Sequence, residues 1–166
     1  MIITPCQSFS QDSPVKNYLM KQEQTSTLLK NIKKLMKLGS KLDDIAAEYP
    51  DFCYVMLSSE QISHVTTICN YQLYLYKLVN NIDEKHSYEY LKKTIKGLAL
   101  AKARIFVELK HIETTESMIK NNAALKIIDE ANQVIQLSLD TFDKILETLQ
   151  TDMQSEKSPS DEKTGI

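Results

Sequence analysis

The chain has 166 residues, of which 42% are hydrophobic and 25% charged, and its formal net charge is −2 at pH 7. This composition is typical of one soluble globular domain, and the near-neutral balance gives no reason to expect nucleic acid or an anionic membrane as the main partner. Three cysteines without a C-x-x-C spacing argue against a disulfide framework and a zinc site. We therefore expect a cytoplasmic or otherwise intracellular protein without metal, cofactor, signal peptide or transmembrane helix.

Few helix-breaking residues interrupt the body of the chain. Between Pro14 and Pro159 there is one proline, Pro50, and there are only two glycines, Gly39 and Gly97. Nearly all the other residues favour or tolerate a helix. The sequence therefore predicts an all-α protein, an up-and-down bundle of four long helices plus one short helix.

Composition divides the chain into three parts. We expect a flexible leader over residues 1–12, a helical bundle domain over 13–150 and a disordered polar tail over 151–166.

The first part of the domain predicts a long helix followed by a short one. Ser13 and Pro14 suit the N-cap and the first helical position, and Gly39 suits the residue that follows a helix ending at Leu38. A short helix should run over residues 40–49 and end at Pro50. Apolar residues of the long helix are expected to face the core: Val15, Tyr18, Leu28, Leu29, Ile32, Leu35 and Met36.

Residues 51–57 are apolar and aromatic, and their short length leaves a helical turn and an extended connector equally open. Ser58 or Ser59 should then cap a second long helix. Its expected core face consists of apolar residues spaced three and four apart: Ile62, Val65, Ile68, Cys69, Tyr76 and Val79. A turn is expected at residues 80–83.

Two more long helices complete the predicted bundle. Ser87 should cap a helix that reaches about Lys120, and residues 121–122 should separate it from a last helix ending near Leu149. The third helix has a seam interrupted by Lys102 and formed by Leu91, Ile95, Leu98, Ile105, Leu109 and Ile112. The last helix has an apolar face formed by Leu125, Ile128, Ile135, Leu139, Phe142, Ile145, Leu146 and Leu149.

The first helix is strongly basic and the last is acidic. The basic face of the first helix comprises Lys30, Lys33, Lys34 and Lys37. One interpretation is intramolecular, with the lysines attracted weakly to acidic residues of the last helix. The other is a surface that binds an acidic protein, an anionic membrane or RNA. This helix has no tryptophan and no arginine cluster. We therefore rank peripheral membrane contact and nucleic acid below protein as partners of the basic face.

A second apolar stripe and a group of tyrosines lie off the predicted core. Leu100, Ala103 and Val107 lie opposite the seam of their helix, with Arg104 and His111 beside them. Tyr71 and Tyr74 also lie off the main face of their helix, where tyrosine suits either an interface or the rim of a core. We expect a non-enzymatic interaction module (an adapter, effector or assembly component) that binds another protein, or itself as a homodimer, through these residues.

Arg104 and His111 also allow an alternative function. The segment from Arg104 to His111 has the form R-x6-H, which resembles the R-x4–6-H signature of the HEPN ribonucleases. In that family the arginine and histidine act on the scissile phosphate within an all-α dimer. The resemblance implies a nuclease in which Arg104 polarises the phosphate and His111 acts as acid or base.

Glu108 and His111 form an E-x-x-H step, the ligand unit of ferritin-like di-iron bundles. That chemistry requires two such units and further inward-facing glutamates. The nearest second unit, Asp83 to His86, falls in a predicted turn, so we expect no metal site.

Overall fold

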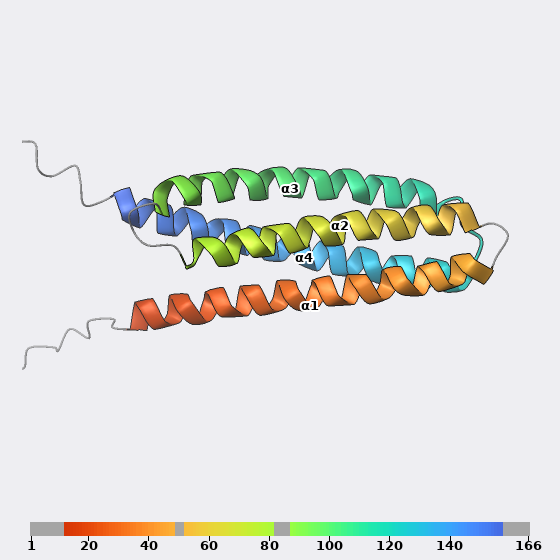
Figure 1. Cartoon of the computed structure of the whole chain (residues 1–166), viewed down its shortest axis with the longest axis horizontal. Coiled ribbons are helices and arrows are strands. Elements are labelled where there is room, and N and C mark those ends of the chain that lie inside the picture. Colours follow the sequence, from red (N-terminus) through yellow and green to blue (C-terminus); the bar gives the residue numbers. More distant parts are fainter. Residues whose placement is uncertain (1–11, 49–51, 82–86, 158–166) are drawn as a thin grey trace, which may run out of the picture.

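The computed structural model describes residues 12–48, 52–81 and 87–157. Four α-helices make up this part of the chain: α1 (Asp12–Glu48), α2 (Phe52–Val79), α3 (Ser87–Glu116) and α4 (Asn122–Lys157). They lie side by side and run alternately in opposite directions (Figure 1). α1 and α3 each pack against both α2 and α4, and α2 also touches α4 across the bundle. The described residues contain no strand, and the all-α prediction is confirmed.

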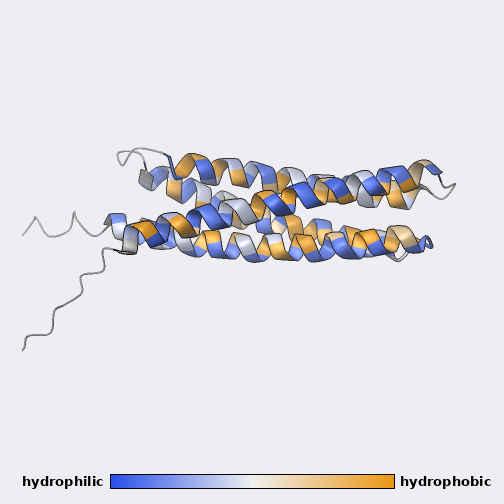
Figure 2. Ribbon diagram, turned by 90° about the horizontal axis from the view of Figure 1, so that it is seen from below, coloured by the Kyte–Doolittle hydropathy of each residue, from blue (hydrophilic) through white to orange (hydrophobic). Residues whose placement is uncertain are grey.

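One hydrophobic core runs the length of the bundle, because each helix turns an apolar stripe inward (Figure 2). The predicted seams of α2, α3 and α4 are confirmed, since their residues are buried or packed against the core. The largest fully buried side chains come from all four helices: Leu28, Leu35, Leu42, Ile62, Tyr76, Leu98, Ile105, Ile112, Ile128, Ile135, Leu139 and Phe142. Lys102, which interrupts the seam of α3, forms an ion pair with Asp143 of α4.

The predicted break at Gly39 is wrong, because α1 continues to Glu48 as a single helix. No described glycine has a positive φ, so Gly39 does not adopt the left-handed conformation that ends a helix. Glycine inside a helix costs only about 1 kcal/mol relative to alanine. Burial of Leu42 and Ala46, one and two turns further on, outweighs that cost.

The predicted start of α2 at Ser58 or Ser59 is also wrong. The helix begins at Phe52, so the described part of the segment left open, residues 52–57, is helical. Both serines lie inside the helix and are buried. Ser59 Oγ is 2.6 Å from Asp43 Oδ1 and 3.2 Å from the Gly39 carbonyl oxygen, so it joins α2 to α1.

The ends of α3 and α4 differ from the prediction by one or two turns. α3 ends at Glu116, and the N–H groups of Met118 and Ile119 close a turn onto carbonyls three residues earlier. Asn121 Oδ1 accepts a hydrogen bond from the Ala124 N–H at 3.0 Å, which caps the start of α4. α4 continues to Lys157, so residues 151–157 are helical and not part of a disordered tail. The leader over residues 1–11 and the tail beyond 157 lie outside the described residues.

Three apolar residues of α1 that were predicted to face the core are exposed instead: Val15, Tyr18 and Met36. The inward line of α1 follows Leu28, traced back by steps of four and three to Gln24 and Lys21, so polar residues take these positions. Within the ranges the structure describes, none of the helices is both long enough and apolar enough to span a bilayer.

Candidate functional site

The outward face of α2 is unlike that of the other helices. Between Glu60 and Lys77, α2 has no aspartate, glutamate, lysine or arginine. Its exposed residues in this stretch are neutral or imidazole side chains: Ser63, His64, Thr67, Asn70, Tyr71 and Tyr74. The other three helices expose charged residues: Lys30, Lys33 and Lys37 on α1, Lys92, Lys96 and Lys110 on α3, and Asp129, Asp140 and Glu147 on α4. A helix that is hydrophobic all round is usually buried, whereas this stretch of α2 exposes neutral polar side chains together with two tyrosines.

The second apolar stripe of α3 lies beside the outward face of α2. The two helices are antiparallel, and His64 Nδ1 lies 3.7 Å from Glu108 Oε1. Seven residues along α2 from His64 is Tyr71, and eight residues back along α3 from Glu108 is Leu100, so Tyr71 and Leu100 lie at the same level of the bundle. We call the surface formed by Tyr71, Tyr74, Leu100, Ala103 and Val107 the α2–α3 face; all five are exposed.

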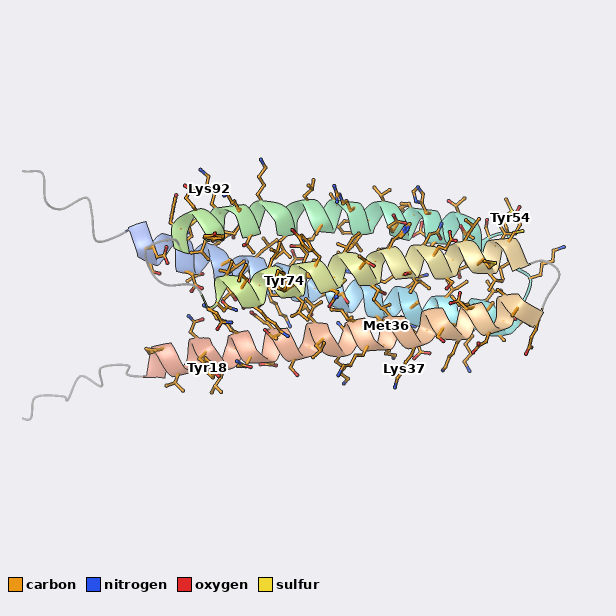
Figure 3. The ribbon with its side chains drawn as sticks, viewed as in Figure 1. Tyr18, Met36, Lys37, Tyr54, Tyr74 and Lys92 are labelled. Atoms are coloured by element: carbon orange, nitrogen blue, oxygen red, sulfur yellow. The ribbon has the colours of Figure 1, made fainter. Side chains whose placement is uncertain are left out.

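The exposed fractions of its large residues are high. Tyr71 is 59% and Tyr74 62% exposed, and Leu100 and Val107 are 55% and 54% exposed. Figure 3 shows Tyr74 on α2. The arrangement brings together two groups of residues that lie about thirty positions apart in the sequence. It offers apolar area with polar phenol tips, a composition enriched at protein interfaces.

A cluster of ionisable side chains borders the α2–α3 face. Glu108 lies between two imidazoles, with Oε1 3.7 Å from His64 Nδ1 and Oε2 3.7 Å from His111 Nδ1. The glutamate side chain is 20% exposed, and both histidines are mostly exposed. Arg104, one turn before Glu108, is also exposed.

Arg104 and His111 both lie on the exposed side of α3, about 10 Å apart along its axis at 1.5 Å per residue. His111 is held by Glu108 one turn earlier, and Arg104 precedes that glutamate by four residues. Among the residues that the structure describes, no group of three or more histidine, cysteine, aspartate or glutamate side chains is placed to hold a metal ion. His86, the other half of the second E-x-x-H candidate, lies outside the described residues.

The four residues of the basic face are exposed, and one of them has an intramolecular partner. Lys34 Nζ lies 2.9 Å from Glu130 Oε1 of α4, and this hydrogen bond lowers the pKa of Glu130. A second ion pair joins the same two helices, with Lys21 Nζ 2.6 Å from Asp152 Oδ2. Attraction between α1 and α4 therefore explains the position of Lys34. Within the described part of the chain, no ion pair involves the other three lysines of the basic face: Lys30, Lys33 and Lys37.

A hollow of about 470 Å³ lies between α1 and α4, and sequence reasoning missed it. Buried Gln24 forms its floor: Gln24 Oε1 accepts a hydrogen bond from the Tyr76 hydroxyl at 2.6 Å, and Gln24 Nε2 donates to Thr148 Oγ1 at 2.9 Å. The signal that could have revealed this network is a glutamine four residues before Leu28, on the inward line of α1. The network therefore joins three helices, α1, α2 and α4.

The two described cysteines differ in environment. Cys53 is exposed, whereas Cys69 is buried in the core. Burial raises the pKa of the Cys69 thiol to about 12, so this thiol is protonated and unreactive at neutral pH.

Comparison with known proteins found no match: no protein family, no curated protein and no solved structure resembles this chain significantly.

Proposed function

We propose that this chain is a non-enzymatic protein-interaction module that binds a protein partner through the α2–α3 face. The observation that carries the proposal is the outward surface of α2, which lacks charged side chains between Glu60 and Lys77 and leaves Tyr71 and Tyr74 about 60% exposed. Removing such surface from water is favourable at about 25 cal/mol per Å². A partner that covers it provides the burial that the fold of one chain does not.

The surroundings of this face support the same function. Interfaces combine a central group of aromatic and aliphatic anchors with a polar rim, and arginine is enriched in them. Tyr71 and Leu100 lie level with each other as central residues, and Arg104 and the histidines border them. The role of the chain is then that of an adapter, effector or assembly component.

Paired aspartates on the face test this proposal. Leu100→Asp with Val107→Asp places two charges where the partner would pack, and we expect affinity for the partner to fall at least tenfold. Ala99→Asp with Phe106→Asp is the matched control, because these residues are exposed on α3 with the same spacing of seven but lie off the face. Affinity capture from native cells, with helical content and thermal midpoint checked for each protein, measures the effect. Equal capture by both double variants would contradict the proposal.

The alternative function is a HEPN-type ribonuclease, and the observation that favours it is the exposure of both Arg104 and His111 on one side of α3. An arginine and an imidazole so placed could together contact one phosphodiester. RNA cleavage by the wild type that is lost in His111→Ala and retained in His64→Ala would support this function. The same background cleavage in all three proteins would exclude it.

A further inference from the structure

We propose that the hollow between α1 and α4 binds a linear polyamine, a chain of methylene groups that carries several ammonium groups. This site lies on another side of the bundle from the α2–α3 face, and it does not depend on the proposed function. The hollow lies toward the end of the bundle where α1 begins and α4 ends (Figure 1). Its volume of about 470 Å³ is within the usual range of about 300–1,000 Å³ for small-molecule sites.

The lining of the hollow extends along both helices. It runs from Asn17 to Thr27 on α1 and from Thr141 to Asp152 on α4, so it covers ten residue steps on one helix and eleven on the other. At 1.5 Å per residue, either stretch is about 15 Å long. A groove of this length between two antiparallel helices favours an extended ligand over a compact one.

The buried floor of the hollow uses its hydrogen-bond donors within the protein. Thr148 Oγ1 donates its proton to the Lys144 carbonyl at 2.9 Å, so towards Gln24 it acts as an acceptor. Gln24 Nε2 therefore faces Thr148, and it also lies 3.4 Å from the Lys144 carbonyl oxygen, so both of its N–H groups are used. Gln24 Oε1 accepts the Tyr76 hydroxyl at 2.6 Å and keeps a second lone pair.

Two more threonines of the lining use their protons in the same way. Thr141 Oγ1 donates to the Leu137 carbonyl at 2.8 Å, and Thr151 Oγ1 donates to the Glu147 carbonyl at 2.9 Å. Thr141 is only 5% exposed, and its oxygen accepts no hydrogen bond from the residues that the structure describes. A lining of oxygens that have already given up their protons can bind only a ligand that supplies donors.

Carboxylates outnumber ammonium groups around the hollow. Three of them line it: Glu23, Glu147 and Asp152. Among the described lining residues, Lys144 is the one that carries an ammonium group. Asp152 is paired with Lys21 at 2.6 Å, whereas no ion pair within the described ranges involves Glu23 or Glu147. Two unpaired carboxylates and one lysine leave the hollow net negative, which favours a cationic ligand.

Apolar groups lie among these acceptors. Met20, which is 40% exposed, lines the hollow, and each lining threonine contributes a methyl group. An inorganic cation would leave these groups in water, and no group of three or more metal-ligating side chains exists in the described part of the chain. A polyamine alternates ammonium groups with methylene segments, so it can pair with the acceptors and cover the apolar groups together.

Calorimetric titration of the full chain with spermidine, a linear triamine, tests the chemistry of the ligand. N1,N8-diacetylspermidine is the matched compound, because its backbone is the same but its two terminal amines are neutral amides. We expect spermidine to bind with one molecule per chain and at least tenfold more tightly than the diacetylated compound. Equal affinities, or no measurable binding of spermidine, would overturn the proposal.

Removal of the unpaired carboxylates tests the location. Glu23→Gln with Glu147→Gln should raise the dissociation constant for spermidine at least tenfold. Glu48→Gln with Glu60→Gln is the control, because it removes the same charge from exposed glutamates outside the hollow, and we expect a change of less than about twofold. Circular dichroism and the thermal midpoint check that each variant is folded. Equal losses in the two double variants would show that only the overall charge attracts spermidine, and would overturn the proposal.

A tethered cation supplies a second readout. Thr151 is exposed and lines the hollow, so Thr151→Lys places an ammonium group where the ligand would bind. We expect this variant to lose at least tenfold in spermidine affinity, and Thr151→Met, with an uncharged side chain of similar length, to lose less. Unchanged affinity in Thr151→Lys would place the ligand elsewhere and overturn the proposal.

Ammonium groups also occur on the lysines of other proteins, and a peptide separates the two sources. An acetylated and amidated trilysine has three side-chain ammonium groups on a bulkier backbone. We expect it to bind at least tenfold more weakly than spermidine, because a free polyamine follows the groove without a branched main chain. Tighter binding of the peptide would overturn the polyamine as the ligand.

Discussion

Two seams of this bundle, one between α1 and α4 and one between α2 and α3, differ in the side chains that lie at the surface. Where α1 and α4 meet, ion pairs and a buried hydrogen-bond network occupy the seam: Lys21 binds Asp152, Lys34 binds Glu130, and Gln24 joins Tyr76 to Thr148. Where α2 and α3 meet, His64 lies beside Glu108 and Gln61 donates to Thr115, and next to them are tyrosines and aliphatic side chains with large exposed fractions.

In the proposed function, this difference is the reason for placing the partner on the α2–α3 face. Charges near the α1–α4 seam find opposite charges within the chain, and they are otherwise well solvated. The exposed apolar groups of the α2–α3 face are not stabilised by ion pairing, because an aliphatic side chain is stabilised only by removal from water. The lysines of α1 thus have a structural explanation at least in part, whereas the α2–α3 face does not.

The largest expected effect distinguishes the core of α3 from its exposed stripe. Ile105→Ala removes a fully buried side chain and should lower the free energy of unfolding by about 2–5 kcal/mol. Val107→Ala, two residues further on and 54% exposed, should change it by less than about 0.5 kcal/mol. Urea denaturation of dilute protein measures both values. Similar losses of unfolding free energy in both variants would show that Val107 packs within the folded chain and is not a partner-binding residue.

High pH tests the network on the α1–α4 side. Burial raises the pKa of Tyr76 from 10.0 to about 12. Between these two values the unfolded chain loses the phenol proton while the folded chain keeps it, so the free energy of unfolding should fall as pH rises, by up to about 1.4 kcal/mol per pH unit. The contribution is fully present below pH 10. Tyr76→Phe should have a shallower decline in denaturation measured from pH 9 to 12, and an unchanged slope would contradict the assignment.

A glycine on the α2–α3 side should be replaceable. Gly97 is helical, its φ is not positive, and an added Cβ would lie 3.9 Å from Gln72 Oε1, an ordinary contact. Gly97→Ala should therefore raise the free energy of unfolding by about 0.5–1 kcal/mol, mainly by restricting the unfolded chain. A lower thermal midpoint in calorimetry would show that α2 and α3 need the glycine for close approach.

The smallest effect concerns the exposed ion pair. Lys34 holds the pKa of Glu130 below its ordinary value, so the pair favours the folded state above the ordinary pKa of a glutamate and loses this effect as pH falls. Lys34→Ala should raise the pKa of Glu130 in a carboxyl NMR titration, whereas Lys30→Ala should leave it nearly unchanged. Equal shifts would mean that the general charge of α1, and not the direct contact, acts on Glu130.

The sequence predicted the class and the core of this fold well but not the limits of its helices. Regular three-and-four spacing identified the seams of α2, α3 and α4, because burial of apolar stripes follows from that spacing. Gly39 and Ser58 misled the prediction, since local terminus signals contribute about 1 kcal/mol each and tertiary packing outweighs them.

The candidate site was only partly accessible from sequence. The spacing on each helix predicted that Tyr71, Tyr74, Leu100 and Val107 lie off the core, and they are exposed. That α2 and α3 bring them together depends on helix pairing and register, which one sequence does not reveal.

Hydroxyl-radical footprinting tests the central claim most directly, because the chain contains its own control. Tyr74 and Tyr18 are 62% and 63% exposed and have the same intrinsic reactivity, but only Tyr74 lies on the α2–α3 face. Comparing the protein in native extract with the purified protein at high dilution, we predict that oxidation of Tyr74 falls several-fold in the extract while that of Tyr18 does not change. Equal oxidation of Tyr74 in both samples, or protection of Tyr18 alone, would contradict the assignment of the α2–α3 face as the surface that a partner covers.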